Sequence, residues 1–154
     1  VYGPWGRPDM ALFLFTKAIL SGNEIDIFNN GNMTRDFTYI DDIIESLVRV
    51  IYKKAEGDQS FDFFDPDPST SWAPHRVLNI GNSNPTPLMD YIQAIEKELK
   101  VTALKEYLPM QPGDVPATAA DTRKLEQWID FKPQTKIEDG VKYFINWYRE
   151  FYKI

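Results

Sequence analysis

The chain has 154 residues, of which 43% are hydrophobic and 26% charged, with 23 acidic against 17 basic residues. This length suits one domain with a sizeable core, and the net charge of −6 excludes a general nucleic-acid surface, which needs clustered lysines and arginines. The absence of cysteine and the single histidine exclude disulfides, thiol chemistry and a zinc site. No apolar run approaches the ~18 residues of a membrane span and no secretory signal opens the chain, so we expect a cytoplasmic protein without a membrane partner.

Hydrophobic periodicity and capping residues predict a mixed α/β chain with several helices and few strands. Two strand-like segments flank the turn residues Asn29-Asn30-Gly31-Asn32, which predicts a small β-hairpin. In chain order we expect a helix at 9–20 capped by Asp9, strands at 24–28 and 33–39, a helix at 40–51 capped by Thr38, a strand at 76–80, a helix at 86–99, a strand at 104–108, a helix at 121–128 capped by Asp121 and a last helix after Thr135.

The stretch Arg35-Asp36-Phe37-Thr38-Tyr39-Ile40-Asp41-Asp42 contains the first candidate binding residues. The guanidinium of Arg35 matches phosphate oxygens two at a time, and Phe37 follows on the same face of the predicted strand. These two side chains could hold a phosphorylated ligand against an aromatic surface. The alternative is an ordinary surface ion pair between Arg35 and Asp36, with Phe37 in the core.

Four segments resemble, in order and spacing, the extended short-chain dehydrogenase/reductases, and within them the UDP-glucuronate 4-epimerases. They are Val1-Tyr2-Gly3-Pro4-Trp5-Gly6-Arg7-Pro8-Asp9-Met10; Asp26-Ile27-Phe28-Asn29-Asn30-Gly31 with Arg35-Asp36-Phe37; Val77-Leu78-Asn79-Ile80-Gly81-Asn82; and Gln111-Pro112-Gly113-Asp114-Val115-Pro116 with Ala120-Asp121. The resemblance implies that residues 1–154 are the C-terminal, substrate-binding portion of a Rossmann-type fold, and that the N-terminal NAD-binding portion is absent from this chain. The complete enzyme would convert UDP-glucuronate to UDP-galacturonate with bound NAD, in polysaccharide biosynthesis.

The same resemblance implies which residues bind the charged parts of a UDP-sugar. Arg7 would pair with the glucuronate carboxylate, and Arg35 would contact the diphosphate. Asp114 matches an acid that binds the ribose hydroxyls. Gln111 stands where many relatives carry an arginine for the phosphate, so it keeps a donor and loses the charge. For Arg7 the alternative is a loop arginine in water.

Aromatic and apolar residues complete the implied site. Phe28 and the backbone around Asp26 match positions that hold the uracil, and Phe37 matches an aromatic that borders the nucleotide. Core packing of the predicted hairpin is the alternative role for these residues. Tyr2 and Pro4 match residues beside the nicotinamide ring of NAD in the complete enzyme.

No catalytic residue is predicted in this chain. It has no G-x-x-G-x-x-G after a strand to hold a dinucleotide pyrophosphate, and no Y-x-x-x-K to supply a general base. Tyr143 and Tyr148 are not followed by lysine four residues later. We therefore expect the chain alone to be inactive and not to bind NAD tightly.

Two other functions and one kind of assembly follow from the same residues. The chain could be a non-catalytic nucleotide-sugar-binding or interaction module, or belong to a nucleotide-sugar 4,6-dehydratase or decarboxylase. The strand expected at 76–80 has no partner, and Trp5, Phe13 and Phe15 are expected to lack cover. Unpaired edges and exposed apolar surface favour association, so we expect self-association here and a homodimer in the complete enzyme.

Overall fold

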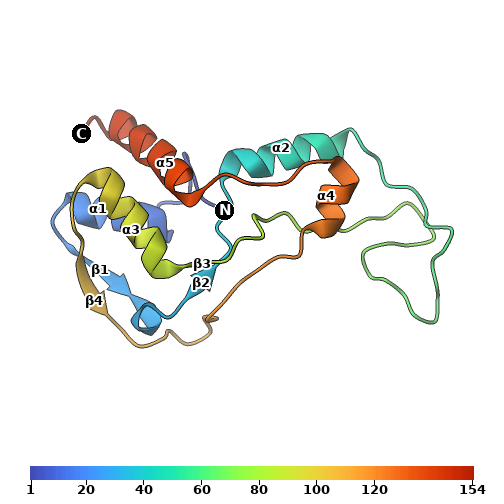
Figure 1. Cartoon of the computed structure of the whole chain (residues 1–154), viewed down its shortest axis with the longest axis horizontal. Coiled ribbons are helices and arrows are strands. Elements are labelled where there is room, and N and C mark those ends of the chain that lie inside the picture. The colour runs from blue at the N-terminus through green and yellow to red at the C-terminus, as the bar shows by residue number, and fades with distance from the viewer.

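The computed structural model describes residues 1–154 as a mixed α/β chain (Figure 1). Its elements in chain order are α1 (Ala11–Leu20), β1 (Glu24–Ile27), the 3₁₀-helix η1 (Phe28–Gly31), β2 (Thr34–Arg35), α2 (Ile40–Ile51), β3 (Thr86–Pro87), α3 (Leu88–Leu99), β4 (Leu104–Tyr107), α4 (Arg123–Ile129) and α5 (Ile137–Tyr152). β1 pairs in parallel with β4, and β2 pairs antiparallel with β3. None of the helices has the length and apolar character that crossing a membrane requires.

The core lies at one end of the molecule, where α3 packs against α1 and α5 and β1 lies beside α1 (Figure 1). The stripe predicted for α3 is confirmed, because its apolar residues recur every three or four positions and are buried. The inward face predicted for α5 is also buried at four of its five positions. The buried residues of the two helices include Leu88, Tyr91, Ile92, Ile95, Leu99, Val141, Phe144, Ile145 and Tyr148.

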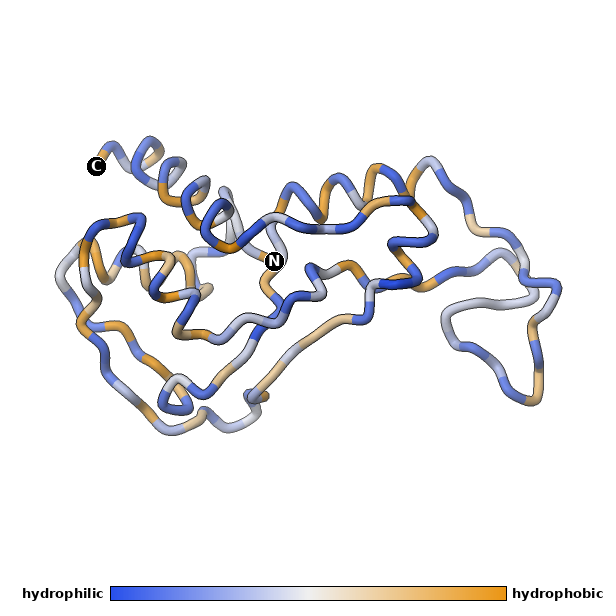
Figure 2. Tube along the Cα trace, viewed as in Figure 1, coloured by the Kyte–Doolittle hydropathy of each residue, from blue (hydrophilic) through white to orange (hydrophobic).

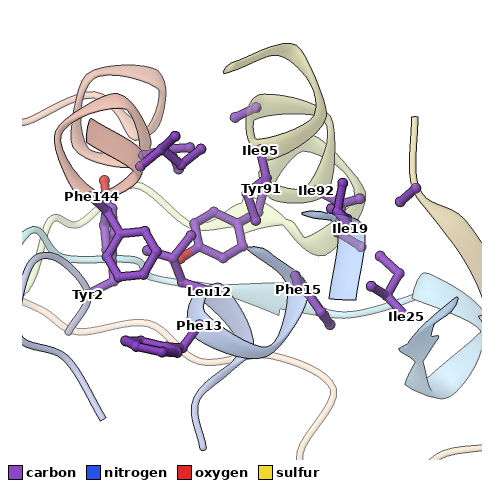
Figure 3. Close-up of a cluster of buried hydrophobic side chains, with 14 of the residues drawn as sticks. Tyr2, Leu12, Phe13, Phe15, Ile19, Ile25, Tyr91, Ile92, Ile95 and Phe144 are labelled. Atoms are coloured by element: carbon purple, nitrogen blue, oxygen red, sulfur yellow. The ribbon is translucent and has the colours of Figure 1, made fainter. Parts of the chain in front are cut away.

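Aromatic rings fill the space between α1, α3 and α5 (Figure 3). Phe13 meets Phe144 and Tyr148 edge-on, with ring centroids 5.7 Å and 5.1 Å apart. Such pairs add about 0.5–1.5 kcal/mol beyond the burial of their area. Phe13 and Phe15 are both buried, so the expectation that they lack cover is wrong. Trp5 is 73% exposed, as expected.

The predicted β-hairpin is wrong. The first strand was located correctly, but it pairs with β4 rather than with the segment that follows it. After Ile27 the chain turns through η1, where Asn29 and Asn30 both have positive φ, and β2 contains only two residues. A parallel partner must come from a distant part of the chain, so a local strand–turn–strand pattern cannot identify it.

The strand predicted at 76–80 is also absent. Arg76 makes an isolated bridge with Thr70, and the residues after it have no regular structure. Val77 is 54% exposed. Apolar and β-branched residues favour a strand only where they pack on a pleated, half-buried surface, and this segment lies on none.

Two of the predicted helix caps have other roles in the structure. Asp9 pairs with Arg7 instead of capping α1, which begins at Ala11 without a side-chain cap. Thr38 accepts a hydrogen bond from the backbone N–H of Asn82, and α2 begins after Tyr39. At α4 the cap position is Thr122 rather than the expected Asp121, although the Asp121 carboxylate accepts the N–H of Arg123 at 3.1 Å.

The helix predicted at 40–51 is confirmed as α2, but four of its apolar residues are exposed. Figure 2 shows hydrophobic residues recurring along this helix. The residues buried in α2 are Asp42 and Ser46, on the side that faces the segment before α5, where Asp42 accepts the N–H of Thr135 at 2.9 Å. The exposed apolar residues, here called the α2 face, are Ile44, Leu47, Val48 and Ile51.

Candidate functional site

One pocket of about 360 Å³ gathers most of the predicted binding residues. It lies between the first residues of the chain, α1, β1, β2 and α3, next to the aromatic core. Of the nine predicted residues, Gln111 and Pro4 do not line it. The seven that do are Tyr2, Arg7, Asp26, Phe28, Arg35, Phe37 and Asp114.

Arg35 extends from β2 toward the loop that carries Asp114. One of its terminal nitrogens donates to Asp114 Oδ1 at 2.8 Å, and the other donates to the carbonyl of Thr34 at 3.0 Å. Backbone bonds hold the loop against β2, because Thr34 N–H donates to the carbonyl of Pro116 at 2.9 Å. A guanidinium has five N–H donors, so several remain for a ligand.

The alternative ion pair between Arg35 and Asp36 is wrong. Both carboxylate oxygens of Asp36 accept backbone N–H groups, one from Ser83 at 3.1 Å and one from Asn84 at 3.3 Å. The partner of Arg35 is Asp114, and this pair is partly exposed, with side-chain exposures of 24% and 34%. An ion pair of this kind contributes little to folding, so Arg35 can exchange partners at small cost.

Phe37 belongs to both the core and the pocket. It is half-buried, packs against the core and stacks on Tyr91 with ring centroids 4.0 Å apart and ring planes at 16°. Phe28 also packs against the core from the start of η1. The pocket therefore places two aromatic rings and a guanidinium along one cavity, an arrangement suited to a flat aromatic group joined to an anion.

Arg7 lies at the exposed rim of the pocket, where it pairs with Asp9. Its Nε donates to Asp9 Oδ1 at 3.1 Å, and the side chains are 75% and 61% exposed. The hydrogen bond and the neighbouring charge raise the pKa of Arg7, and the bond from Arg7 lowers the pKa of Asp9. Since an exposed pair of this kind is screened by water, Arg7 is available to an anionic ligand at the rim.

Tyr2 turns its ring to the pocket and its hydroxyl away from it. A Cβ at Gly140 in α5 would lie 2.2 Å from Tyr2 Oη, and this buried oxygen has no hydrogen-bond partner. Burial is the main cause that raises the pKa of Tyr2, so the hydroxyl stays protonated at neutral pH. Pro4 lies outside this pocket, and the roles of Tyr2 and Pro4 beside the nicotinamide ring of a complete enzyme stay a prediction.

Several pocket residues were not predicted as site residues. Tyr91 and Leu88 of α3 line the cavity, although their periodicity indicated only core packing. Met10, Met33 and Thr118 line it as well. An apolar stripe on a helix does not distinguish a core from a pocket wall, so no signal in the sequence separated the two.

Known proteins share the sequence features of this chain. A family model described as "NAD dependent epimerase/dehydratase family" matches residues 1–81, which is more than half of the chain. The chain belongs to this family. Its curated relatives include Protein CapI of Staphylococcus aureus, 54% identical over 153 residues that cover 99% of this chain and 46% of that protein. The probable UDP-glucuronate 4-epimerase of Rhizobium meliloti is 46% identical over 154 residues, covering 99% of this chain and 45% of that protein.

Solved structures of the NAD dependent epimerase/dehydratase family have the same fold. The UDP-glucuronic acid 4-epimerase of Bacillus cereus, in complex with UDP-glucuronic acid and NAD, has a TM-score of 0.79 and 30% identity. The match covers 98% of this chain and 43% of that enzyme. The predicted α/β class and the resemblance to extended short-chain dehydrogenases are confirmed, and the chain spans slightly less than half the length of the relatives it matches.

Proposed function

We propose that residues 1–154 form the C-terminal UDP-sugar-binding portion of a UDP-glucuronate 4-epimerase. The observation that carries this proposal is the pocket in which Arg35, Asp114 and two aromatic rings meet. Similarity to UDP-glucuronate 4-epimerases over nearly the whole chain supports it. The NAD-binding portion would belong to an N-terminal segment, and NAD held there would supply the redox chemistry for inversion at C4 of the sugar. This chain alone would then bind substrate without turnover.

In this proposal the charged groups of the ligand replace the carboxylates that pair with two arginines in the free protein. The diphosphate takes over the Arg35 guanidinium from Asp114, which frees the Asp114 carboxylate to accept the ribose hydroxyls. Both side chains are partly exposed, so the exchange costs little. Arg7 leaves Asp9 in the same way and pairs with the glucuronate carboxylate. Gln111 is exposed and outside the pocket, so the diphosphate depends on Arg35.

The uracil would lie against Phe28 and the backbone near Asp26, with Phe37 bordering the nucleotide. Stacking on an aromatic ring holds a flat base without charge, and amide groups of the backbone can read its polar edge. The mainly apolar lining around these rings excludes water from the base. Recognition is thus divided between an apolar end for the base and an arginine end for the anion.

The ligand class can be tested by titrating UDP, UDP-glucuronate and NAD into the 154-residue chain by calorimetry. We expect the two uridine nucleotides to bind more tightly than NAD, because the pocket has the features of a nucleotide-sugar site and lacks a dinucleotide turn. Measurable binding of UDP with weak or no binding of NAD is the expected result. Tight NAD binding without UDP binding would contradict the proposal.

We further propose that the chain self-associates through the α2 face, and that the complete enzyme is a homodimer. Replacing Leu47 and Ile51, which are 44% and 76% exposed, by lysine should lower the apparent mass in sedimentation velocity experiments across concentrations. The control is Val101→Lys, at a residue that is 43% exposed and lies outside the α2 face. A wild-type chain that stays monomeric at all concentrations would contradict the proposal and favour an autonomous binding module.

A further inference from the structure

The turn at residues 82–84 directs three consecutive backbone N–H groups at the segment that contains Arg35 and Phe37. The N–H of Asn82 donates to Thr38 Oγ1 at 3.1 Å, and those of Ser83 and Asn84 donate to the two oxygens of Asp36. Ser83 has a φ of 51°, in the left-handed region. Successive N–H groups in such a turn form a concave site that binds anions. Here the anion is the carboxylate of Asp36.

The turn is also fixed from its other side. Ser83 Oγ donates to the carbonyl of Ala120 at 3.1 Å and lies 2.5 Å from Oγ1 of Thr122, which is 1% exposed. A Cβ at Gly81 would lie 2.9 Å from Asp36 Oδ2 and 3.0 Å from the Cβ of Ala120. There is no room for a side chain between Gly81 and the carboxylate, so a larger residue at position 81 would push the carboxylate out of the turn.

Asp36 lies between Arg35 and Phe37 in the chain, and all three residues line the pocket. Holding its carboxylate fixes the backbone from which both neighbours extend. The same hydrogen bonds engage both oxygens of Asp36, so this carboxylate does not form an ion pair with the adjacent guanidinium. By holding Asp36, the turn at 82–84 thus directs Arg35 into the pocket and leaves its guanidinium available to a ligand.

We propose that Asp36, held by the turn at 82–84, is a positioning residue that aims Arg35 at the diphosphate of the bound nucleotide. This inference rests on the proposed function, because it requires a diphosphate in the pocket. It adds a specific requirement: discrimination between a nucleotide and its nucleoside depends on a carboxylate that acts by positioning Arg35.

The test compares the affinities of the 154-residue chain for UDP and for uridine. Asp36→Asn keeps the size of the side chain, removes its charge and places an N–H₂ group against a backbone N–H. Gly81→Ala acts on the same carboxylate from the turn. We expect each variant to weaken UDP binding about tenfold, close to the lower limit for a lost hydrogen bond to a charged group, and to leave uridine binding nearly unchanged. Asp41→Asn, at an exposed residue in the first turn of α2, is the charge-matched control and should behave as wild type.

A double variant of Arg35 and Asp36 distinguishes a positioning role of Asp36 from a general structural role. In an Arg35→Ala background, Asp36→Asn should cause no further loss of UDP affinity, because the group that it positions is gone. An unchanged ratio of UDP to uridine affinity in folded Asp36→Asn or Gly81→Ala would overturn the inference, even if the affinity for both ligands falls. If one variant does not fold, as judged by circular dichroism, the other decides. A wild-type chain that binds UDP no better than uridine would overturn the proposed function itself, and this inference with it.

Discussion

The Arg35→Ala variant is expected to bind UDP more weakly than the wild type by about 1.5–3 kcal/mol, the usual effect of losing a hydrogen bond to a charged group. Two arginines line the pocket, and Arg7 lies at its exposed rim, so Arg35 is the partly buried one. Titration calorimetry with UDP measures the difference. Arg35→Lys keeps the charge but loses the fork geometry, so an intermediate affinity is expected.

The matched control for this variant is Arg123→Ala. Arg123 also forms an ion pair with an aspartate, but its side chain is 82% exposed and it lies outside the pocket. UDP affinity should not change in this control. Unchanged UDP affinity in a folded Arg35→Ala variant would remove Arg35 from the site. Stability is a separate readout, because losing the partly exposed pair with Asp114 should cost at most about 1 kcal/mol.

The second large effect is expected on the stability of the folded chain. Replacing Tyr91 by alanine should lower the free energy of unfolding by about 3–5 kcal/mol, the range for deleting a large aromatic side chain from a core. Tyr91 is 1% exposed, meets Tyr2 edge-on at 5.8 Å and stacks on Phe37. Its removal leaves a cavity between α1, α3 and α5, next to the pocket (Figure 3). Urea unfolding followed by circular dichroism measures the change.

Tyr143→Ala is the control for the core prediction. Tyr143 lies on α5 and is 51% exposed, so its replacement should change the free energy of unfolding by only about 0.5 kcal/mol. A Tyr91→Ala variant as stable as Tyr143→Ala would show that the cluster around Tyr91 does not hold the fold together. The two substitutions remove the same atoms, so the comparison isolates burial.

The helices that form the core could be predicted from the sequence because their signal is local. In α3 and α5 the apolar residues recur with the helical period over three or more turns, and the predicted faces are buried. The α2 helix was equally clear, yet its apolar face is exposed. Periodicity identifies the face of a helix that can be buried, but whether another element covers it depends on the rest of the molecule.

Strand pairing could not be predicted in the same way. The first strand was located correctly, but its partner begins at Leu104, about eighty residues later. A turn sequence after Ile27 favoured a local partner, and the chain uses that turn as a 3₁₀-helix instead. Long-range pairing is decided by which backbones the packed helices bring together, and this information is not present in a short window of sequence.

The residues of the candidate site were predicted mainly from the resemblance to a known family. The structure brings most of them together, but not all. Seven of the nine residues line one pocket, and their roles toward a ligand stay predictions. The bonds that define the free site were not predicted. Arg35 and Asp114 are 79 positions apart, and Asp36 is 47 positions from Ser83. Side-chain bonds over such separations depend on the tertiary fold, which neither residue type nor local spacing specifies.

A crystal structure of the chain with UDP tests most directly whether the pocket beside Arg35 is a nucleotide-sugar site. We expect UDP in this pocket, with the diphosphate on Arg35, the uracil beside Phe28 and the bond between Arg35 and Asp114 broken. A second cavity, lined by Arg76 and Lys124, is another place where cations could attract the nucleotide. UDP bound there, with the pocket beside Arg35 empty, would contradict the account.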